Sequence, residues 1–334
     1  MNFLSPRFLP MALAALIAVG GAADSQAIGV WHRDYASAQA EARTEGKDIL
    51  IVFTGTDWIE LCAKFYDEIL GEPEFIEAVS GKFALLKLEY PKDSNLPRTE
   101  YAEKAVLRDA YRVRGFPTVV LTDIAGRPFG LNGYQPATPG AYAEQILEIE
   151  KAHQESLEAI KGAERLEGVE RAKQISEAIP DLPETLMARF YRKEMEAVLA
   201  ADSGDALKLR KPFRKLLAED EFAKQLQVLA KESKWTEMIA LTNDHIFQQE
   251  LEGTEKQIAM INRSGLEMRA GLKGSAEETL RAVVKIDPDS QPGKTAARLL
   301  ESPNLSDETT LEKKELKPEK KPGEGSSLRA QPVP

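Results

Sequence analysis

The chain has 334 residues, of which 43% are hydrophobic and 29% are charged, proportions typical of folded domains rather than of disordered or fibrous chains. Its 44 Lys and Arg against 54 Asp and Glu give a net charge of −10, which disfavours nucleic-acid binding because the chain as a whole repels phosphates. One cysteine excludes an intramolecular disulfide, and the three histidines, His32, His153 and His245, are far apart, so we expect no metal site and no cofactor.

Residues 1–27 have the features of a cleaved export signal. Arg7 precedes an apolar run from Phe8 to Val19, and the segment ends in the small-residue sequence Ser25-Gln26-Ala27, which suits signal peptidase. The alternative is a membrane anchor, but Met11–Val19 is well short of the roughly 20 apolar residues that span a bilayer. We therefore predict a periplasmic or secreted protein, without a transmembrane segment after signal cleavage, in a compartment where thiols meet oxidants.

Residues 28–151 alternate between predicted helices and strands. The run Ile-Leu-Ile-Val-Phe at residues 49–53 is apolar without alternation, which is typical of a strand buried on both faces. We expect helices over Asp34–Gly46, Asp57–Leu70, Thr99–Tyr111 and Tyr142–His153, and strands over Asp48–Thr54, Phe83–Glu89, Thr118–Asp123 and Arg127–Leu131. Thr56 or Asp57 can cap the second helix. This order predicts an α/β domain with a mixed sheet flanked by helices on both faces.

Residues 152–301 lack strand patterns and predict an all-α domain of helical hairpins. The expected helices are Glu158–Ala178, Pro183–Ala201, Asp205–Leu217, Asp220–Ser233, Thr236–Gln249, Thr254–Gly271 and Ala276–Ile286. Residues 258–290 faintly resemble a tetratricopeptide repeat, but most repeat positions do not match, so an irregular helical domain is the alternative. Residues 302–334 are rich in Lys, Glu and Pro and predict a disordered tail, either simply solvated or a tether to the cell wall or a partner.

The segment from Phe53 to Cys62 contains the most informative motif of the chain. It reads Phe-Thr-Gly-Thr-Asp-Trp-Ile-Glu-Leu-Cys and resembles exported bacterial members of the thioredoxin-like superfamily, in which the first strand runs into F-T-G-S-D-W-C-x-x-C. Gly115-Phe116-Pro117-Thr118 is similar to the cis-proline loop of that family, and residues 126–134 are similar to its closing hairpin. The resemblance covers residues 30–151 and implies a thioredoxin-like domain over residues 28–151.

One departure from the family pattern bears directly on activity. The position of the attacking cysteine holds Ile59, whereas the position of the resolving cysteine is kept as Cys62. In the family the first sulfur lies at a helix N-terminus, where open amides and the helix dipole stabilise the attacking thiolate, and the second sulfur releases the product. Ile59 supplies no nucleophile, and the charge of Glu60 disfavours a thiolate nearby. The resemblance therefore implies that the first step of the redox cycle is lost.

Three residues around the motif each allow two interpretations. Cys62 is either a small, inert apolar residue packed beneath the helix or an exposed monothiol that forms a mixed disulfide with a partner. Pro117 either only shapes a turn or, as the resemblance implies, follows a cis Phe116–Pro117 bond that leaves a strand edge free to pair with an extended peptide. Trp58 is either a surface platform beside the motif or a core aromatic residue.

These observations support two classes of function. The first is a non-catalytic module that binds protein or peptide partners in the cell envelope. Its candidate peptide-binding residues are Trp58, Ile59, Phe116, Pro117 and Thr118. The second is an enzyme, a thiol-disulfide oxidoreductase or isomerase with Cys62 as its catalytic residue. In a third interpretation the helical half carries the function and the first domain is a folded spacer.

Overall fold

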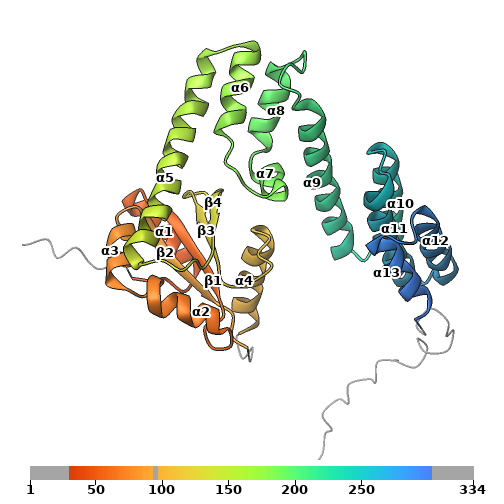
Figure 1. Ribbon diagram of the computed structural model, residues 1–334, viewed down its shortest axis with the longest axis horizontal. Coiled ribbons are helices and arrows are strands. Elements are labelled where there is room, and N and C mark those ends of the chain that lie inside the picture. Colours follow the sequence, from red (N-terminus) through yellow and green to blue (C-terminus); the bar gives the residue numbers. More distant parts are fainter. Residues whose placement is uncertain (1–29, 93–96, 303–334) are drawn as a thin grey trace, which may run out of the picture. The chain divides into compact units, whose positions relative to one another are not determined.

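The computed structural model describes residues 30–92 and 97–302, and the chain divides into two compact units, with the boundary between Arg210 and Lys211 (Figure 1). The predicted export signal at residues 1–27 lies outside the described residues, as does the predicted tail apart from Ser302. In the part of the chain that the structure describes, no helix combines the length and apolar character needed to cross a bilayer.

The first unit is built on a four-stranded mixed sheet with the order β2-β1-β3-β4. The central strand β1 pairs in parallel with β2 and antiparallel with β3, which in turn pairs antiparallel with β4. The strands are β1 (Asp48–Thr54), β2 (Phe83–Glu89), β3 (Thr118–Thr122) and β4 (Pro128–Asn132). The sequence predictions for the four strands are thus confirmed to within one residue at each end.

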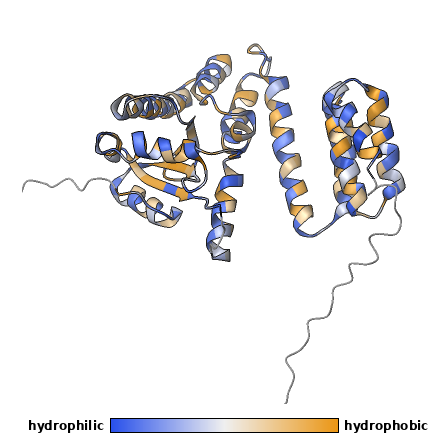
Figure 2. Ribbon diagram, turned by 60° about the horizontal axis from the view of Figure 1, so that its bottom comes forward, coloured by the Kyte–Doolittle hydropathy of each residue, from blue (hydrophilic) through white to orange (hydrophobic). Residues whose placement is uncertain are grey.

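Helices cover both faces of this sheet. They are α1 (Tyr35–Glu45), α2 (Glu60–Phe65), the π-helix η1 (Tyr66–Leu70), α3 (Pro73–Ser80), α4 (Arg98–Ala110) and α5 (Pro139–Gly162). Leu50 and Val52 of β1 pack in a core with α2, η1, α3 and α5, whereas Ile49, Ile51 and Phe53 pack in a second core with α1 and α4. Because successive strand side chains point to opposite faces, burial of both faces explains the unbroken apolar run of β1, and the strands are accordingly orange in Figure 2.

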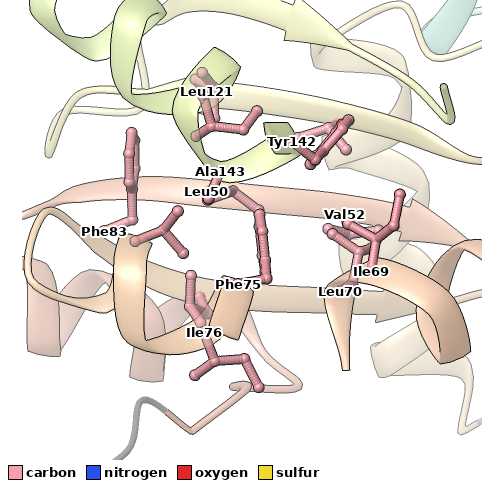
Figure 3. Close-up of a cluster of buried hydrophobic side chains, with 14 of the residues drawn as sticks. Leu50, Val52, Ile69, Leu70, Phe75, Ile76, Phe83, Leu121, Tyr142 and Ala143 are labelled. Carbon is pink, nitrogen blue, oxygen red and sulfur yellow. The ribbon is translucent and has the colours of Figure 1, made fainter. Parts of the chain in front are cut away.

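The larger of the two cores is dominated by aromatic and branched side chains. Figure 3 shows Phe75 of α3 and Tyr142 of α5 converging on the side of β1 that carries Leu50. All three side chains are completely buried. Burial of each such side chain contributes about 1.5–3 kcal/mol, so this core fixes the position of α5 on the sheet.

Three further helices belong to the same unit. They are α6 (Gly168–Ala178), α7 (Glu184–Phe190) and α8 (Arg192–Ala201), which follow a short 3₁₀ turn, η2 (Ala163–Arg165). The Tyr191 hydroxyl donates to the Pro128 carbonyl of β4 at 3.0 Å, and Arg127 forms a 2.7 Å ion pair with Glu194 of α8. The sequence places a boundary between residues 151 and 152, but α5 passes through it, and these contacts attach the first helices of the predicted helical domain to the sheet.

A group of charged side chains gathers at the N-terminal end of β1. Asp48 is half-buried, and Lys82 lies 3.4 Å from the nearly buried Glu150. Burial raises the pKa of the Asp48 carboxyl to about 7, and the neighbouring Asp123 and Glu150 carboxylates add to this rise, while Lys82 opposes it. At pH 7 the Asp48 carboxyl is therefore about half protonated in the folded protein, and it holds its proton at lower pH.

The second unit is helical and contains α9 (Arg210–Lys231), α10 (Trp235–Gln248), α11 (Gly253–Arg269), α12 (Lys273–Ile286) and α13 (Gln291–Leu300). The completely buried Gln257 of α11 connects three of these helices. Its Nε2 donates to the carbonyls of Val283 at 3.0 Å and Asp287 at 2.8 Å, and its Oε1 accepts from the Ser290 hydroxyl at 2.8 Å. These bonds satisfy carbonyls at the end of α12 and join α11 to the start of α13.

The helices differ from the sequence predictions where the pattern gave no clear break. The break predicted between His153 and Glu158 is absent, because residues 142–161 contain no Gly or Pro; α5 continues to Gly162, and the break falls between Gly162 and Gly168, inside the second predicted helix. Similarly, α9 is continuous across residues 218–219, where a break is predicted, because residues 213–231 contain no Gly or Pro. The predicted helix 183–201 breaks at Tyr191 into α7 and α8. The sequence analysis predicts neither α3 nor α13.

Candidate functional site

The segment between β1 and α2 brings the motif to one end of the sheet. Ile59 is the N-cap residue of α2, with an extended backbone (φ −113°, ψ 106°), and its side chain forms no capping hydrogen bond. Its own N–H donates to the Gly55 carbonyl at 2.9 Å. Among the described residues, the amides of Glu60 and Leu61 have no acceptor. The helix therefore begins with open amides beside an apolar side chain.

The two residues predicted to cap this helix bind elsewhere, so that prediction is wrong. The Thr56 hydroxyl donates to Glu89 Oε1 at 2.9 Å, and Asp57 Oδ2 accepts from the Lys92 amide at 3.1 Å. Both partners lie at or just after the end of β2. Because α2 begins only at Glu60, neither side chain reaches its first amides; instead, both attach the motif segment to the neighbouring strand.

Trp58 lies on the surface as part of an aromatic cluster. Its side chain is 47% exposed, and its indole N–H donates to the Tyr90 carbonyl at 2.8 Å. The Phe116 ring meets Trp58 edge-on at 6.4 Å between centroids and stacks on Tyr90 at 4.8 Å. A Cβ on the buried Gly55 would lie 2.5 Å from the Trp58 indole nitrogen, so only glycine leaves room for the indole. Trp58 is thus a fixed platform rather than a core residue.

Tyr90 anchors this cluster to the rest of the domain. Its hydroxyl donates to the Lys104 carbonyl of α4 at 2.7 Å, and its ring stacks on Phe53 of β1 at 6.2 Å. Burial raises the pKa of the Tyr90 hydroxyl, so it remains a hydrogen-bond donor.

The loop before β3 places an open stretch of backbone beside Trp58. The Phe116–Pro117 peptide bond is cis, and the Thr118 hydroxyl donates to the Gly115 carbonyl at 2.8 Å. Thr118 then enters the sheet opposite Phe53 of β1. Within residues 30–92 and 97–302, the N–H and C=O groups of Phe116 have no hydrogen-bond partner. These groups are therefore available to an added strand of polypeptide.

Cys62 lies in the first turn of α2 and is only 1% exposed. A thiol in that position packs as a small apolar residue. Formation of a mixed disulfide requires an approach to the sulfur that this burial blocks. The burial of Cys62 therefore agrees with the interpretation of Cys62 as a packed, inert residue.

A groove runs beside the aromatic cluster. Trp58, Ile59 and Phe116 form its apolar part, and the segment that ends α4 and leads to Phe116 forms its other wall. Pro117, Thr118 and Cys62 do not line it. Three of the predicted site residues therefore come together in one groove.

The sequence interpretation missed the charged wall of this groove. It contains three arginines, Arg108, Arg112 and Arg114, together with Asp109. The signal was present in the stretch Arg-Asp-Ala-Tyr-Arg-Val-Arg that directly precedes Gly115. No three His, Cys, Asp or Glu side chains gather in a metal-binding arrangement in the described ranges.

The comparisons with known proteins agree with this geometry. The family model described as a thioredoxin-like domain matches residues 35–146. Residues 35–146 form a thioredoxin-like domain. The match includes the motif segment, the loop before β3 and all four strands, so the fold that the resemblance implied is confirmed for this part of the chain, and a helical region follows it.

Two curated relatives, both from Chlamydia pneumoniae, share this part of the chain. The disulfide bond reductase DsbH is 29% identical over 112 residues, which is 34% of this chain and 68% of that protein. The thioredoxin-related protein DsbJ is 33% identical over 98 residues, which is 29% of this chain and 28% of that protein. The matched region of DsbJ is thus under a third of its length.

Two solved structures are also similar. A DsbH oxidoreductase structure matches 43% of this chain and 95% of that chain, with 26% identity and a TM-score of 0.36. The solution structure of a thioredoxin from Thermus thermophilus matches 37% of this chain and 86% of that chain, with 21% identity and a TM-score of 0.28.

Proposed function

We propose that this protein binds extended polypeptide segments in the cell envelope without exchanging disulfides. The observation that carries the proposal is the start of α2, where Ile59 occupies the position that a nucleophilic sulfur would need, while Cys62, the single sulfur of the motif, is 1% exposed. A thiolate must be both formed and reached for exchange to begin. Ile59 has no sulfur, and the burial of Cys62 blocks the approach of a disulfide to its sulfur.

The groove itself remains suited to a peptide. The open backbone of Phe116 offers one N–H and one C=O to an added strand, which is the source of affinity in β-strand addition. Trp58 and Ile59 lie alongside and offer apolar surface to alternate side chains of that strand. Replacement of the nucleophile by isoleucine enlarges this apolar surface.

The cellular compartment is part of the proposal. Residues 1–27 combine a basic residue, an apolar run and small residues before the expected cleavage position. One relative is named as a disulfide bond reductase and another as a thioredoxin-related protein. Their names support a disulfide-related setting, and we infer that this protein works there as a binding partner of unfolded or extended chains.

Binding is tested with a reduced, carboxymethylated polypeptide as probe, measured by isothermal titration calorimetry with the purified protein. Trp58→Ala and Phe116→Ala should each lower the affinity by about tenfold or more, because aromatic anchors dominate such interfaces. Phe247→Ala, which removes an aromatic ring that is 81% exposed in the helical unit, is the matched control and should leave the affinity unchanged. Equal affinity in all four proteins would refute the proposed groove.

The second candidate is a thiol-disulfide oxidoreductase that uses Cys62, favoured by the persistence of a cysteine at the resolving position and by the reductase name of one relative. Its test is an insulin-reduction assay with dithiothreitol. We expect the protein not to accelerate the reaction. Catalytic turnover that Cys62→Ser abolishes would establish the enzyme and contradict the proposed binding module.

A further inference from the structure

The charged wall of the peptide groove differs in sign from the chain as a whole. Arg108 lies in the last turn of α4, Arg112 lies in the turn after it with a left-handed backbone (φ 53°), and Arg114 leads into Gly115. Together with Asp109 they contribute three positive charges and one negative charge to the lining. The whole chain carries a net charge of −10. The groove is therefore a local positive site on an acidic protein.

Two of the three arginines lack a carboxylate partner. Arg112 Nη1 lies 3.1 Å from Asp109 Oδ1, and this pair neutralises itself. No acidic group among the described residues forms an ion pair with Arg108 or Arg114. The Arg108 guanidinium lies 5.9 Å from the centre of the Tyr90 ring, the ring that also stacks on Phe116. Arg108 thus lies at the edge of the aromatic cluster, within cation–π range of Tyr90, and within residues 30–92 and 97–302 its guanidinium donates no hydrogen bond.

We propose that the groove selects extended polypeptides that carry carboxylate side chains beside the segment that pairs with Phe116; this inference rests on the proposed function. Successive side chains of an extended peptide point to opposite sides, so one set can contact Trp58 and the other set can reach the arginines. An arginine guanidinium binds a carboxylate of the peptide through two parallel hydrogen bonds. A lysine of the peptide in place of that carboxylate would be repelled by the arginine. The partner chemistry is therefore an acidic, unfolded or extended segment of protein.

The charge effect has a size that binding experiments can resolve. An exposed ion pair changes an equilibrium constant by about two- to fivefold. Contacts with both Arg108 and Arg114 should therefore favour an acidic peptide over a neutral one by about tenfold. This preference should weaken as salt is added, because the screening length falls from about 30 Å at 0.01 M to about 8 Å at 0.15 M.

The experiment compares three fluorescein-labelled peptides of Val, Thr and Gln that carry Asp, Asn or Lys at alternate positions, with binding followed by fluorescence anisotropy. The purified protein should bind the Asp peptide most tightly and the Lys peptide most weakly. Arg114→Glu should abolish or reverse the order, and Arg108→Gln should reduce the preference by about two- to fivefold. Arg43→Gln is the control: it removes one positive charge at the exposed end of α1, outside the groove, and should leave the order unchanged.

Each remaining outcome decides between the inference and the function on which it rests. Equal affinity for the Asp and Asn peptides, with binding still dependent on Trp58, would overturn the acidic preference and leave the binding module in place. Absence of binding for all three peptides would overturn both. Tighter binding of a single-stranded oligonucleotide than of the Asp peptide would also overturn the inference, because it would show a response to phosphate rather than to acidic polypeptide.

Discussion

Replacement of Ile59 by cysteine should give this domain thiol-disulfide activity in the insulin-reduction assay. The change places a sulfur at the N-cap of α2, next to the amides of Glu60 and Leu61, which have no acceptor within the described residues. It also recreates a C-x-x-C spacing with Cys62, whose burial suits the resolving role in such a pair. The fold around the site should be unaffected, because Ile59 is only half-buried and makes no capping hydrogen bond.

The expected activation follows from the interaction of a thiolate with a helix N-terminus. Such an interaction contributes about 0.3–1 kcal/mol at exposed sites and up to about 2 kcal/mol in partly buried ones. With about 1.4 kcal/mol per pKa unit, the pKa of the new thiol falls from about 8.5 to between about 7.0 and 8.3. At pH 7 the thiolate fraction therefore rises from about 3% to between about 5% and 50%. The neighbouring Glu60 opposes this shift, so Ile59→Cys combined with Glu60→Gln should lie at the upper end.

The assay is the reduction of insulin by dithiothreitol, together with the pH dependence of iodoacetamide labelling. Ile59→Cys should accelerate reduction, and Ile59→Cys with Cys62→Ser should instead accumulate a stable mixed disulfide. Leu61→Cys is the matched control, because its side chain is 44% exposed in the same turn but lacks the C-x-x-C spacing. If Ile59→Cys labels with an unshifted pKa and catalyses no reduction, the account of the open amides at this helix start is wrong.

Three further predictions concern stability and the aromatic platform. Asp48→Asn should stabilise the protein by about 1–2 kcal/mol at pH 8, a value reduced for the solvent screening of a half-buried group. Because the pKa of Asp48 is raised to about 7 in the folded protein, the contribution of this carboxyl to wild-type stability falls as pH rises from about 4 to 7. Urea unfolding should therefore show no difference between the two proteins at pH 4. Gln257→Leu should cost about 2–3 kcal/mol in urea unfolding because it leaves buried partners unsatisfied, whereas the exposed Gln248→Leu should cost little. Gly55→Ala should displace the Trp58 indole, seen as a change in near-UV circular dichroism, and weaken binding of the carboxymethylated polypeptide.

The sheet was predictable because its physical signal is local. An apolar run such as residues 49–53 is buried on both faces only as a central strand with cover on each side, and the structure places it there as β1. The motif was also predictable, because Trp58, Ile59 and Cys62 lie within one short stretch of sequence. The cluster of Trp58 with Phe116 needed the resemblance, because residues 58 apart in sequence meet only through the pairing of β1 with β3.

The helical half was harder to predict because helix ends depend on contacts as well as on sequence. The α5 helix continues past residue 151 since nothing in residues 142–161 stops it, and the contact of Tyr191 with β4 then keeps the next helices in the first unit. No pattern within residues 182–201 shows that a tyrosine hydroxyl will bond to a strand carbonyl some 63 residues earlier. Boundaries of this kind are set by tertiary packing rather than by propensity.

The positions of Trp58 and Phe116 do not depend on any sulfur, and this separates binding from reactivity in this domain. The indole is held by the Tyr90 carbonyl and by the space that Gly55 leaves, and the Phe116 ring is held by stacking on Tyr90. The platform and its open backbone therefore do not require a sulfur at residue 59. In the proposed function, a bound polypeptide would therefore leave the groove at a rate set by its non-covalent contacts with these residues.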